Sequence, residues 1–182
     1  MILLFGPTGA GKSVQGQMLA VRMGWKWLST GEMLRNSADP EVIRVLKSGE
    51  LVSDELTYEV FDEAIQDAKA KNFPRTIVDG FPRTKEQAEW LANYITQNNE
   101  TIDLVVTLEV PESEIMARLE KRARMEDTPE TIARRMTIYR QKMYPISGEF
   151  ADSGIKIVHI EGTGTAGEVH DKIYDEVEKV CS

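Results

Sequence analysis

Short apolar runs alternate along the chain with longer stretches in which apolar residues recur at helical spacing. The apolar runs predict strands at 2–5, 25–28, 76–79, 104–109 and 155–160, and the helical spacing predicts helices near 13–23, 30–36, 41–48, 54–71, 84–97, 111–122, 129–143 and 165–180. In the last helix, Val169, Ile173 and Val177 fall on one face. Strands that alternate with helices indicate an α/β fold, with a parallel sheet and helices on both faces. In such a sheet, ligands bind beyond the carboxyl ends of the strands.

A glycine-rich loop follows the first predicted strand directly. Residues 6–13 read Gly-Pro-Thr-Gly-Ala-Gly-Lys-Ser, which is the pattern G-x-x-x-x-G-K-S. Gly9 and Gly11 let the backbone bend so that its N–H groups point at phosphate oxygens, and the following helix directs its positive end to the same place. Lys12 supplies a cation for the β- and γ-phosphates, and the Ser13 hydroxyl can reach Mg²⁺. A plain strand-to-helix turn needs neither this spacing nor the Lys-Ser pair, so the pattern predicts a P-loop that binds a nucleoside triphosphate.

The third predicted strand ends in an acid and enters a second loop at the same edge of the sheet. Asp79 fits a Walker B carboxylate that orients Mg²⁺ and its waters, although a strand-end aspartate can also cap a helix. Arg83 follows in the loop 80–83, where it can form a two-pronged contact with phosphate oxygens. Thr84 and Gln87 have the spacing of a capping box. Spacing alone therefore does not decide whether Gln87 caps the helix or contacts a ligand.

Cations gather in one stretch of an otherwise acidic chain. Lys and Arg total 22 against 30 Asp and Glu, for a net charge of −8, which argues against nucleic acid or an anionic membrane as the main partner. Arg118 and Arg122 lie four residues apart on one predicted helix face, Arg124 follows, and Arg135 lies on the next helix. A cationic helix face is most often only solvated. Beside a phosphate site, however, a local basic patch suits a small polyanion.

Length and cysteine content limit the class of protein further. A chain of 182 residues is large enough for one domain with a substantial core. Its single cysteine, Cys181, excludes an internal disulfide and a multi-cysteine zinc site, and fits a reducing compartment. No apolar run approaches membrane-spanning length. We therefore expect a cytoplasmic protein without zinc or a membrane partner, and a monomer rather than an oligomer.

Five stretches of the chain together resemble adenylate kinase, in order and nearly in spacing: 6–13, 29–35, 49–55, 79–84 and 161–164. The resemblance covers essentially the whole chain, and the Asp-Gly-Phe-Pro-Arg stretch from Asp79 is specific to nucleoside monophosphate kinases. It implies a P-loop fold with a five-stranded parallel core, as one kinase domain over 1–182. It also implies an AMP-binding insertion at 29–59 and a LID reduced to 121–127.

The resemblance also implies roles for individual residues. Those expected to bind ATP are Gly9, Ala10, Gly11, Lys12, Ser13, Val14, Arg118, Arg122 and Gly164. Those expected to bind AMP are Thr30, Arg35, Glu50, Leu51, Val52, Gly80, Phe81, Pro82, Arg83, Gln87, Arg124 and Arg135. The expected catalytic residues are Lys12, Arg83, Arg122, Arg124 and Arg135, and the expected Mg²⁺ partners are Ser13 and Asp79, directly or through water.

The implied reaction is ATP + AMP ⇌ 2 ADP with Mg²⁺ as cofactor. It needs no general base, because the AMP phosphate is already an oxyanion at neutral pH. Thr30 and Gln87 match the AMP-accepting version of the wider family. A UMP/CMP-type kinase stays open as an alternative, because both residues can be caps. A non-catalytic nucleotide sensor is the second alternative, but it would need only the P-loop.

Three features depart from the family pattern. Thr8 replaces a proline that is usual in the loop, and Ser13-Val14 replaces the usual Gly-Thr, so the metal contact is expected to differ in detail. Arg122 and Arg124 are separated by a single residue, which leaves almost no LID. We therefore expect the site to close by movement of the insertion 29–59, with the arginines reaching in from helix ends.

Overall fold

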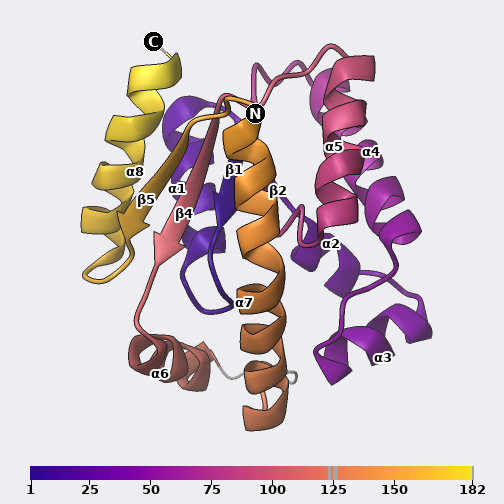
Figure 1. Ribbon diagram of the computed structural model, residues 1–182, viewed down its shortest axis with the longest axis vertical. Coiled ribbons are helices and arrows are strands. Elements are labelled where there is room, and N and C mark those ends of the chain that lie inside the picture. The colour runs from indigo at the N-terminus through magenta and orange to yellow at the C-terminus, as the bar shows by residue number, and fades with distance from the viewer. Residues whose placement is uncertain (123, 125–126, 182) are drawn as a thin grey trace.

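The computed structural model describes residues 1–122, 124 and 127–181. Within them, five strands form one sheet in the order β2-β3-β1-β4-β5, and every neighbouring pair is parallel. The strands are β1 (Ile2–Phe5), β2 (Lys26–Ser29), β3 (Thr76–Asp79), β4 (Leu104–Glu109) and β5 (Ile157–Glu161). The predicted parallel α/β core is confirmed, with strand ends shifted by one or two residues (Figure 1).

The described part of the chain has eight helices, of which seven connect these strands and α8 follows the last strand. They are α1 (Lys12–Met23), α2 (Thr30–Arg35), α3 (Pro40–Ser48), α4 (Asp54–Ala70), α5 (Lys85–Gln97), α6 (Glu112–Arg122), α7 (Pro129–Asp152) and α8 (Ala166–Cys181). Each lies where the sequence predicts a helix. None of them is long and apolar enough to cross a membrane.

One predicted helix boundary is wrong. The seventh helix was predicted over 129–143, but α7 continues to Asp152 with Pro145 inside it. A proline in a helix interior removes one hydrogen bond and crowds the preceding turn. Beyond the proline, however, Ile146 and Phe150 are buried in the core, and the Phe150 ring lies 6.0 Å from the ring of Phe5. This packing keeps the chain helical past Pro145.

The sheet is covered on both faces, as the alternation of side chains along β1 requires. Leu3 and Phe5 point into a cluster formed with α4, α5 and α7, whereas Ile2 and Leu4 point into a second cluster formed with α1 and α8. Figure 1 shows α7 in front of the sheet, with α1 and α8 behind it. The buried sheet thereby provides a rigid base for the loops at both of its ends.

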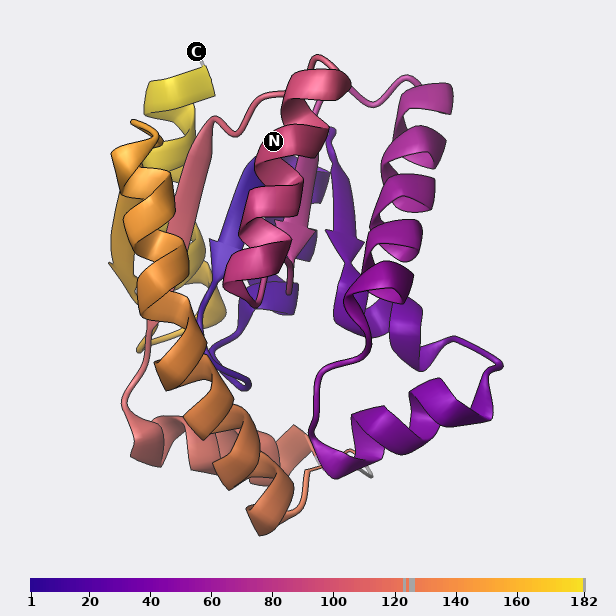
Figure 2. The same ribbon diagram turned by 45° about the vertical axis from the view of Figure 1, so that its right-hand side comes forward.

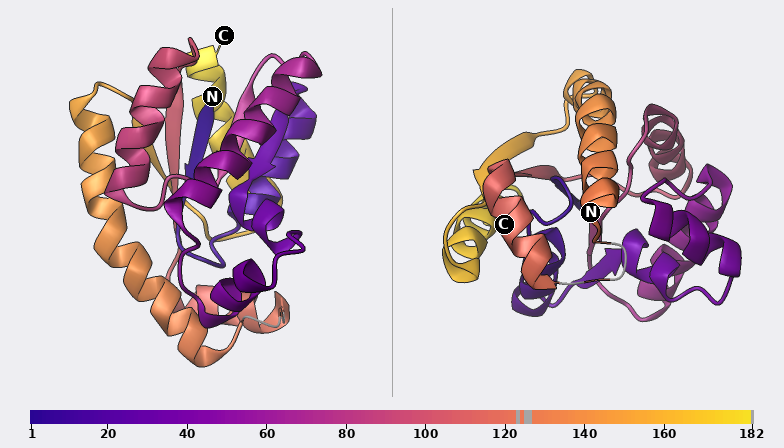
Figure 3. Two further views of the ribbon diagram at one scale, coloured as in Figure 1. Left: turned by 90° about the vertical axis from the view of Figure 1, so that its right-hand side faces the viewer. Right: turned by 90° about the horizontal axis from the view of Figure 1, so that it is seen from below.

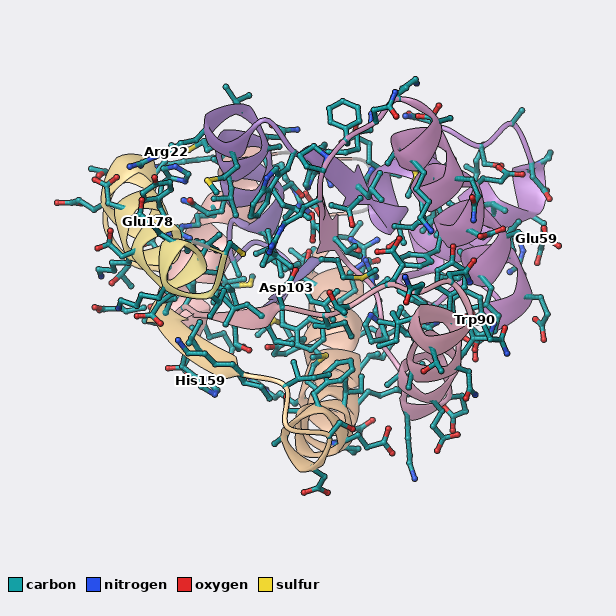
Figure 4. All side chains as sticks on the ribbon, turned by 90° about the horizontal axis from the view of Figure 1, so that it is seen from above. Arg22, Glu59, Trp90, Asp103, His159 and Glu178 are labelled. Atoms are coloured by element: carbon teal, nitrogen blue, oxygen red, sulfur yellow. The ribbon has the colours of Figure 1, made fainter. Side chains whose placement is uncertain are left out.

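The two ends of the sheet are different. At the amino ends of the strands, Asp103 binds the Met1 amino group (2.8 Å) and Arg75 (3.1 Å), and Figure 4 views the molecule from this end. At the carboxyl ends, α2 and α3 project on one side, while α6 and the first half of α7 project on the other (Figures 2 and 3). The projecting helices therefore leave room for a ligand beyond the carboxyl ends.

Candidate active site

A cleft of about 430 Å³ lies at the carboxyl ends of the strands. Its volume is within the usual range for a small-molecule site. Most of the predicted site residues line it: Gly9, Gly11, Lys12, Ser13, Val14, Arg35, Glu50, Leu51, Asp79, Gly80, Pro82, Arg83, Arg118, Arg122, Arg124 and Arg135. The fold thus brings the P-loop, the insertion 29–59, the loop 80–83 and the cationic helices to one place.

The other predicted residues are not part of the cleft wall: Ala10, Thr30, Val52, Phe81, Gln87 and Gly164. Ala10 and Phe81 are buried beneath their loops. The Thr30 hydroxyl donates to the Gly80 carbonyl (2.9 Å), so that it ties the start of α2 to the loop 80–83. Ligand contacts by these side chains stay predictions.

The P-loop has the backbone that its glycines predict. Gly9 and Gly11 have φ of +82° and +98°, in the left-handed region that favours glycine. A Cβ on Gly9 would also lie 3.0 Å from Leu119 of α6, so a larger residue would collide with the helix that carries the arginines.

Lys12 begins α1 and folds back over the loop. Its ammonium donates to the carbonyls of Gly6 (2.8 Å) and Pro7 (3.0 Å). Burial in the cleft lowers the pKa of Lys12 to about 8, although Asp79 acts in the opposite direction. The lysine is thus held above the loop by weak neutral acceptors. A phosphate oxygen would be a stronger partner because it is charged.

Ser13 and Asp79 are in direct contact. The Ser13 hydroxyl donates to Asp79 Oδ2 at 2.6 Å, and Asp79 is 3% exposed at the end of β3. The alternative role of Asp79 as a helix cap has no support, because Thr84 caps the following helix α5. A hydroxyl and a carboxylate are oxygen donors of the kind that Mg²⁺ prefers, so the pair fits the predicted metal.

Gln87 shows how a spacing pattern can leave a role open. Its backbone N–H donates to Thr84 Oγ1 (3.1 Å), which is half of the predicted capping box. Its side chain does not complete the box. Instead, Oε1 accepts from the Arg83 N–H (2.7 Å) and Nε2 donates to Asp54 (2.7 Å), the first residue of α4. The buried amide therefore ties the loop 80–83 to the end of the insertion 29–59.

Two arginines are anchored by backbone carbonyls. Arg83 donates through Nε to Gly80 O at 2.7 Å, and Gly80 has a φ of +88°. A Cβ on Gly80 would lie 2.8 Å from Arg83 Nη2, so only glycine fits beneath the guanidinium. Arg118 donates to Gly162 O (2.8 Å) and to Ala10 O (3.3 Å), and thereby joins the P-loop to the loop that precedes α8.

The remaining arginines gather around Asp127, a residue that the sequence analysis did not select. Arg122 donates to both oxygens of Asp127 (2.8 and 2.5 Å), the Arg124 N–H donates at 3.3 Å, and Arg135 lies 3.9 Å away. Burial favours the neutral acid, but the hydrogen bond and charge of Arg122 prevail and hold the pKa of Asp127 below its usual range. The sequence did offer one signal for Asp127. It is an acidic residue within the cationic stretch, and it directly precedes the Thr128-Pro129 pair that starts α7.

The predicted LID at 121–127 includes residues 123, 125 and 126, which lie outside the described residues. Its described members Arg122 and Arg124 line the cleft.

An apolar wall also went unpredicted. Ile138, Tyr139 and Met143 of α7 line the cleft. Ile138 and Tyr139 lie three and four residues after Arg135, so helical spacing places them on the same face as that arginine. That spacing could have identified them from the sequence, since Arg135 was already a candidate.

Comparison with known proteins agrees with this geometry. The family model described as adenylate kinase matches residues 4–155. A protein named adenylate kinase from Thermus thermophilus is 36% identical over 182 residues, with 94% of each chain covered. Another of that name from Maricaulis maris is 38% identical, with 92% of this chain and 93% of its own covered. A third, from Agrobacterium fabrum, is 34% identical and covers 100% of this chain and 99% of its own. The chain therefore belongs to the adenylate kinase family.

Proposed function

We propose that this chain catalyses reversible phosphoryl transfer from ATP to AMP, giving two ADP. One observation carries the proposal: the P-loop lysine and six arginines line a single cleft, together with the Ser13–Asp79 pair. Five of these cations, Lys12, Arg83, Arg122, Arg124 and Arg135, are the predicted catalytic residues. Binding one nucleotide at a P-loop requires far fewer cations than this, whereas aligning two polyanionic substrates requires several.

In the proposed step, an oxygen of the AMP phosphate attacks the γ-phosphorus of ATP. A new P–O bond forms to AMP, and the bond from the γ-phosphorus to the β–γ bridging oxygen breaks, so that the electron pair leaves with ADP. No proton needs to be removed from the attacking oxyanion. The barrier is mainly repulsion and misalignment between the two substrates. Lys12 and the arginines would offset that repulsion by hydrogen bonds aimed at the transferring oxygens.

The metal assignment rests on the donor set. Ser13 and Asp79 would hold Mg²⁺, directly or through water, and bound Mg²⁺ supplies positive charge at the β- and γ-phosphate oxygens.

The insertion 29–59 is proposed as the AMP side of the cleft. Arg35, Glu50 and Leu51 of this insertion line the cleft. A Cβ on Gly31 would lie 3.3 Å from Arg35 Nη1 and 3.4 Å from Arg83 Nη2, so two guanidinium groups approach the same backbone. Such a pair can bind one phosphate group from two directions. We place the AMP phosphate there, on the side of the cleft away from Arg118.

The test is ADP formation from ATP with AMP, dAMP, GMP, UMP and CMP as alternative acceptors. AMP should give the highest kcat/KM, and chelation of Mg²⁺ should abolish turnover until Mg²⁺ is restored. Equal or better turnover of UMP or CMP would favour the other kinase class. ATP binding without turnover of any acceptor would favour a nucleotide sensor.

A further inference from the structure

The carboxyl end of α3, within the insertion 29–59, is docked against the first turns of α7. Three consecutive carbonyls of α3 accept hydrogen bonds from α7 side chains. Leu46 O accepts from Arg135 Nη2 (3.0 Å), Lys47 O accepts from Thr131 Oγ1 (3.3 Å), and Ser48 O accepts from Arg134 Nη1 (3.3 Å). Figure 2 shows the end of α3 beside the lower part of α7.

These carbonyls are good acceptors for a physical reason. The last carbonyls of a helix have no partners within the helix, and they form the negative end of its dipole. In α3, the N–H of Gly49 caps only the carbonyl of Leu46. Thr131 and Arg134 of α7 thus cap the carbonyls of Lys47 and Ser48, and Arg135 adds a second donor to the carbonyl of Leu46. Two of the three donors are cationic.

The backbones also approach closely at this point. Gly49 has a φ of +78°, and a Cβ there would lie 2.8 Å from the Thr131 methyl group and 3.2 Å from the Thr131 carbonyl. Only glycine allows this approach. The end of α3 and the start of α7 are therefore in close backbone contact. Thr131 lies at the centre of this contact and is 6% exposed.

An ion pair extends the contact to the edge of the cleft. Arg134 Nη1 also donates to Glu50 Oε1 at 2.8 Å, and both side chains are about half exposed, at 50% and 53%. Glu50 lines the cleft, but Arg134 does not. Arg134 therefore reaches the site only through the insertion that it holds.

We propose that Arg134 and Thr131 form a latch that holds the insertion 29–59 closed over the cleft, so that Arg134 is a positioning residue for phosphoryl transfer. The inference rests on the proposed function. Closing the insertion against α7 brings Arg35, Glu50 and Leu51 to the same cleft as Arg122 and Arg135. The LID predicted from the sequence is short, so we assign part of the covering role to α7, whose residues Ile138, Tyr139 and Met143 line the cleft.

The first test is steady-state kinetics of Arg134→Met, which keeps the length of the side chain and removes its charge and donors. The KM for AMP should rise about fivefold, as expected for one exposed ion pair plus one hydrogen bond. The KM for ATP and kcat should change by less than about twofold, because Arg134 touches neither the P-loop nor the cleft. Arg140→Met is the matched control, since Arg140 lies on the same helix and pairs with Glu112 of α6 instead.

Two results separate a latch from a merely structural role. Arg134→Lys should restore most of the AMP affinity, because an ammonium can still reach Glu50 and a carbonyl. An unchanged KM for AMP in Arg134→Met, or equal increases in both KM values, would overturn the latch.

The second test measures the closed state without turnover. Spin labels at Ile43→Cys on α3 and Thr137→Cys on α7, in a Cys181→Ser background, report the distance between the helices; both positions are exposed. Without nucleotide, a short distance should dominate, and Arg134→Met should shift the population to longer distances. Identical distributions would overturn the latch even if AMP is turned over. Conversely, absence of AMP turnover in the unmodified chain would overturn the proposed function and leave this distance test standing.

Discussion

Arg122 and Asp127 form an ion pair with two hydrogen bonds at the edge of the cleft, at 2.8 and 2.5 Å. The Asp127 side chain is 2% exposed and that of Arg122 is 28% exposed, so the carboxylate is buried while the guanidinium still faces the cleft. A carboxylate matches the planar guanidinium in the same two-pronged way as a phosphate does. Asp127 thus fixes the orientation of Arg122 before any phosphate is bound.

The first prediction concerns this geometry. Arg122→Lys keeps the charge but replaces a planar group with a compact ammonium, which cannot bind Asp127 and a phosphate oxygen in fixed directions. We expect kcat to fall about 100-fold or more, as for loss of one positioned donor to the transition state. Arg140→Lys, on the surface of α7, should leave kcat unchanged. Near-normal activity of Arg122→Lys would show that charge alone is sufficient at this position.

The second prediction uses the pKa of Asp127. Because this pKa is held below its unfolded value, Asp127 stabilises the fold above the unfolded pKa, and the contribution is lost as pH falls through the folded pKa. Asp127→Asn should therefore lower the free energy of unfolding at pH 7 by about 1–3 kcal/mol. The difference from the unmodified chain should shrink as the pH falls below about 4.

Urea unfolding at pH 7 and at pH 3.5 measures both quantities for Asp127→Asn. Glu120→Gln is the control, because Glu120 is exposed on the neighbouring helix α6. A difference in stability that stays constant between the two pH values would mean that Asp127 does not act through its charge.

The third prediction concerns Lys12. Lys12→Met removes two hydrogen bonds to loop carbonyls, which are weak and replaceable by water, so the fold should survive. The kcat should fall at least about 100-fold, because the charge at the transferring phosphoryl is lost. Lys142→Met, an exposed substitution on α7, serves as the control in the same assay. A folded Lys12→Met variant with normal turnover would contradict the P-loop mechanism.

The parts of the fold that the sequence predicts are those governed by local patterns. β1 is a continuous apolar run, β3 is a short β-branched run that ends in an acid, and the glycine-containing loop after each has a fixed spacing, so both strands and their loops could be located from the sequence. The end of α7 could not, because Pro145 is a local signal to stop, and only the distant packing of Ile146 and Phe150 overrides it.

In the candidate site, too, local patterns predict some features and not others. A spacing pattern identifies residues that face a ligand, and Lys12, Asp79 and Arg122 all line the cleft. It does not identify the partner of a side chain when that partner comes from another element. The contact of Gln87 with Asp54 joins residues 33 apart in sequence, and the contact of Arg134 with Glu50 joins residues 84 apart. Such pairs depend on how helices pack, which no local pattern specifies.

The last prediction compares two helical glycines whose replacement by alanine should have opposite effects. A Cβ on Gly16 of α1 would lie 2.5 Å from Trp27 Cδ1 and 3.1 Å from Leu4 Cδ1. Because Gly16 has no side chain, α1 can pack this closely on the sheet. Gly16→Ala should therefore lower the free energy of unfolding by about 1–3 kcal/mol, the usual effect of overpacking.

A Cβ on Gly148 of α7 would meet nothing within 4 Å. Gly148→Ala should raise the free energy of unfolding by about 0.5–1 kcal/mol, because alanine loses less backbone entropy than glycine when a helix forms. Urea unfolding of both variants under one set of conditions gives the two values and their signs. If Gly16→Ala were as stable as Gly148→Ala, α1 would have to move away from β2 at little cost. The close contact of Gly16 with Trp27 would then not determine how the P-loop helix is seated on the sheet.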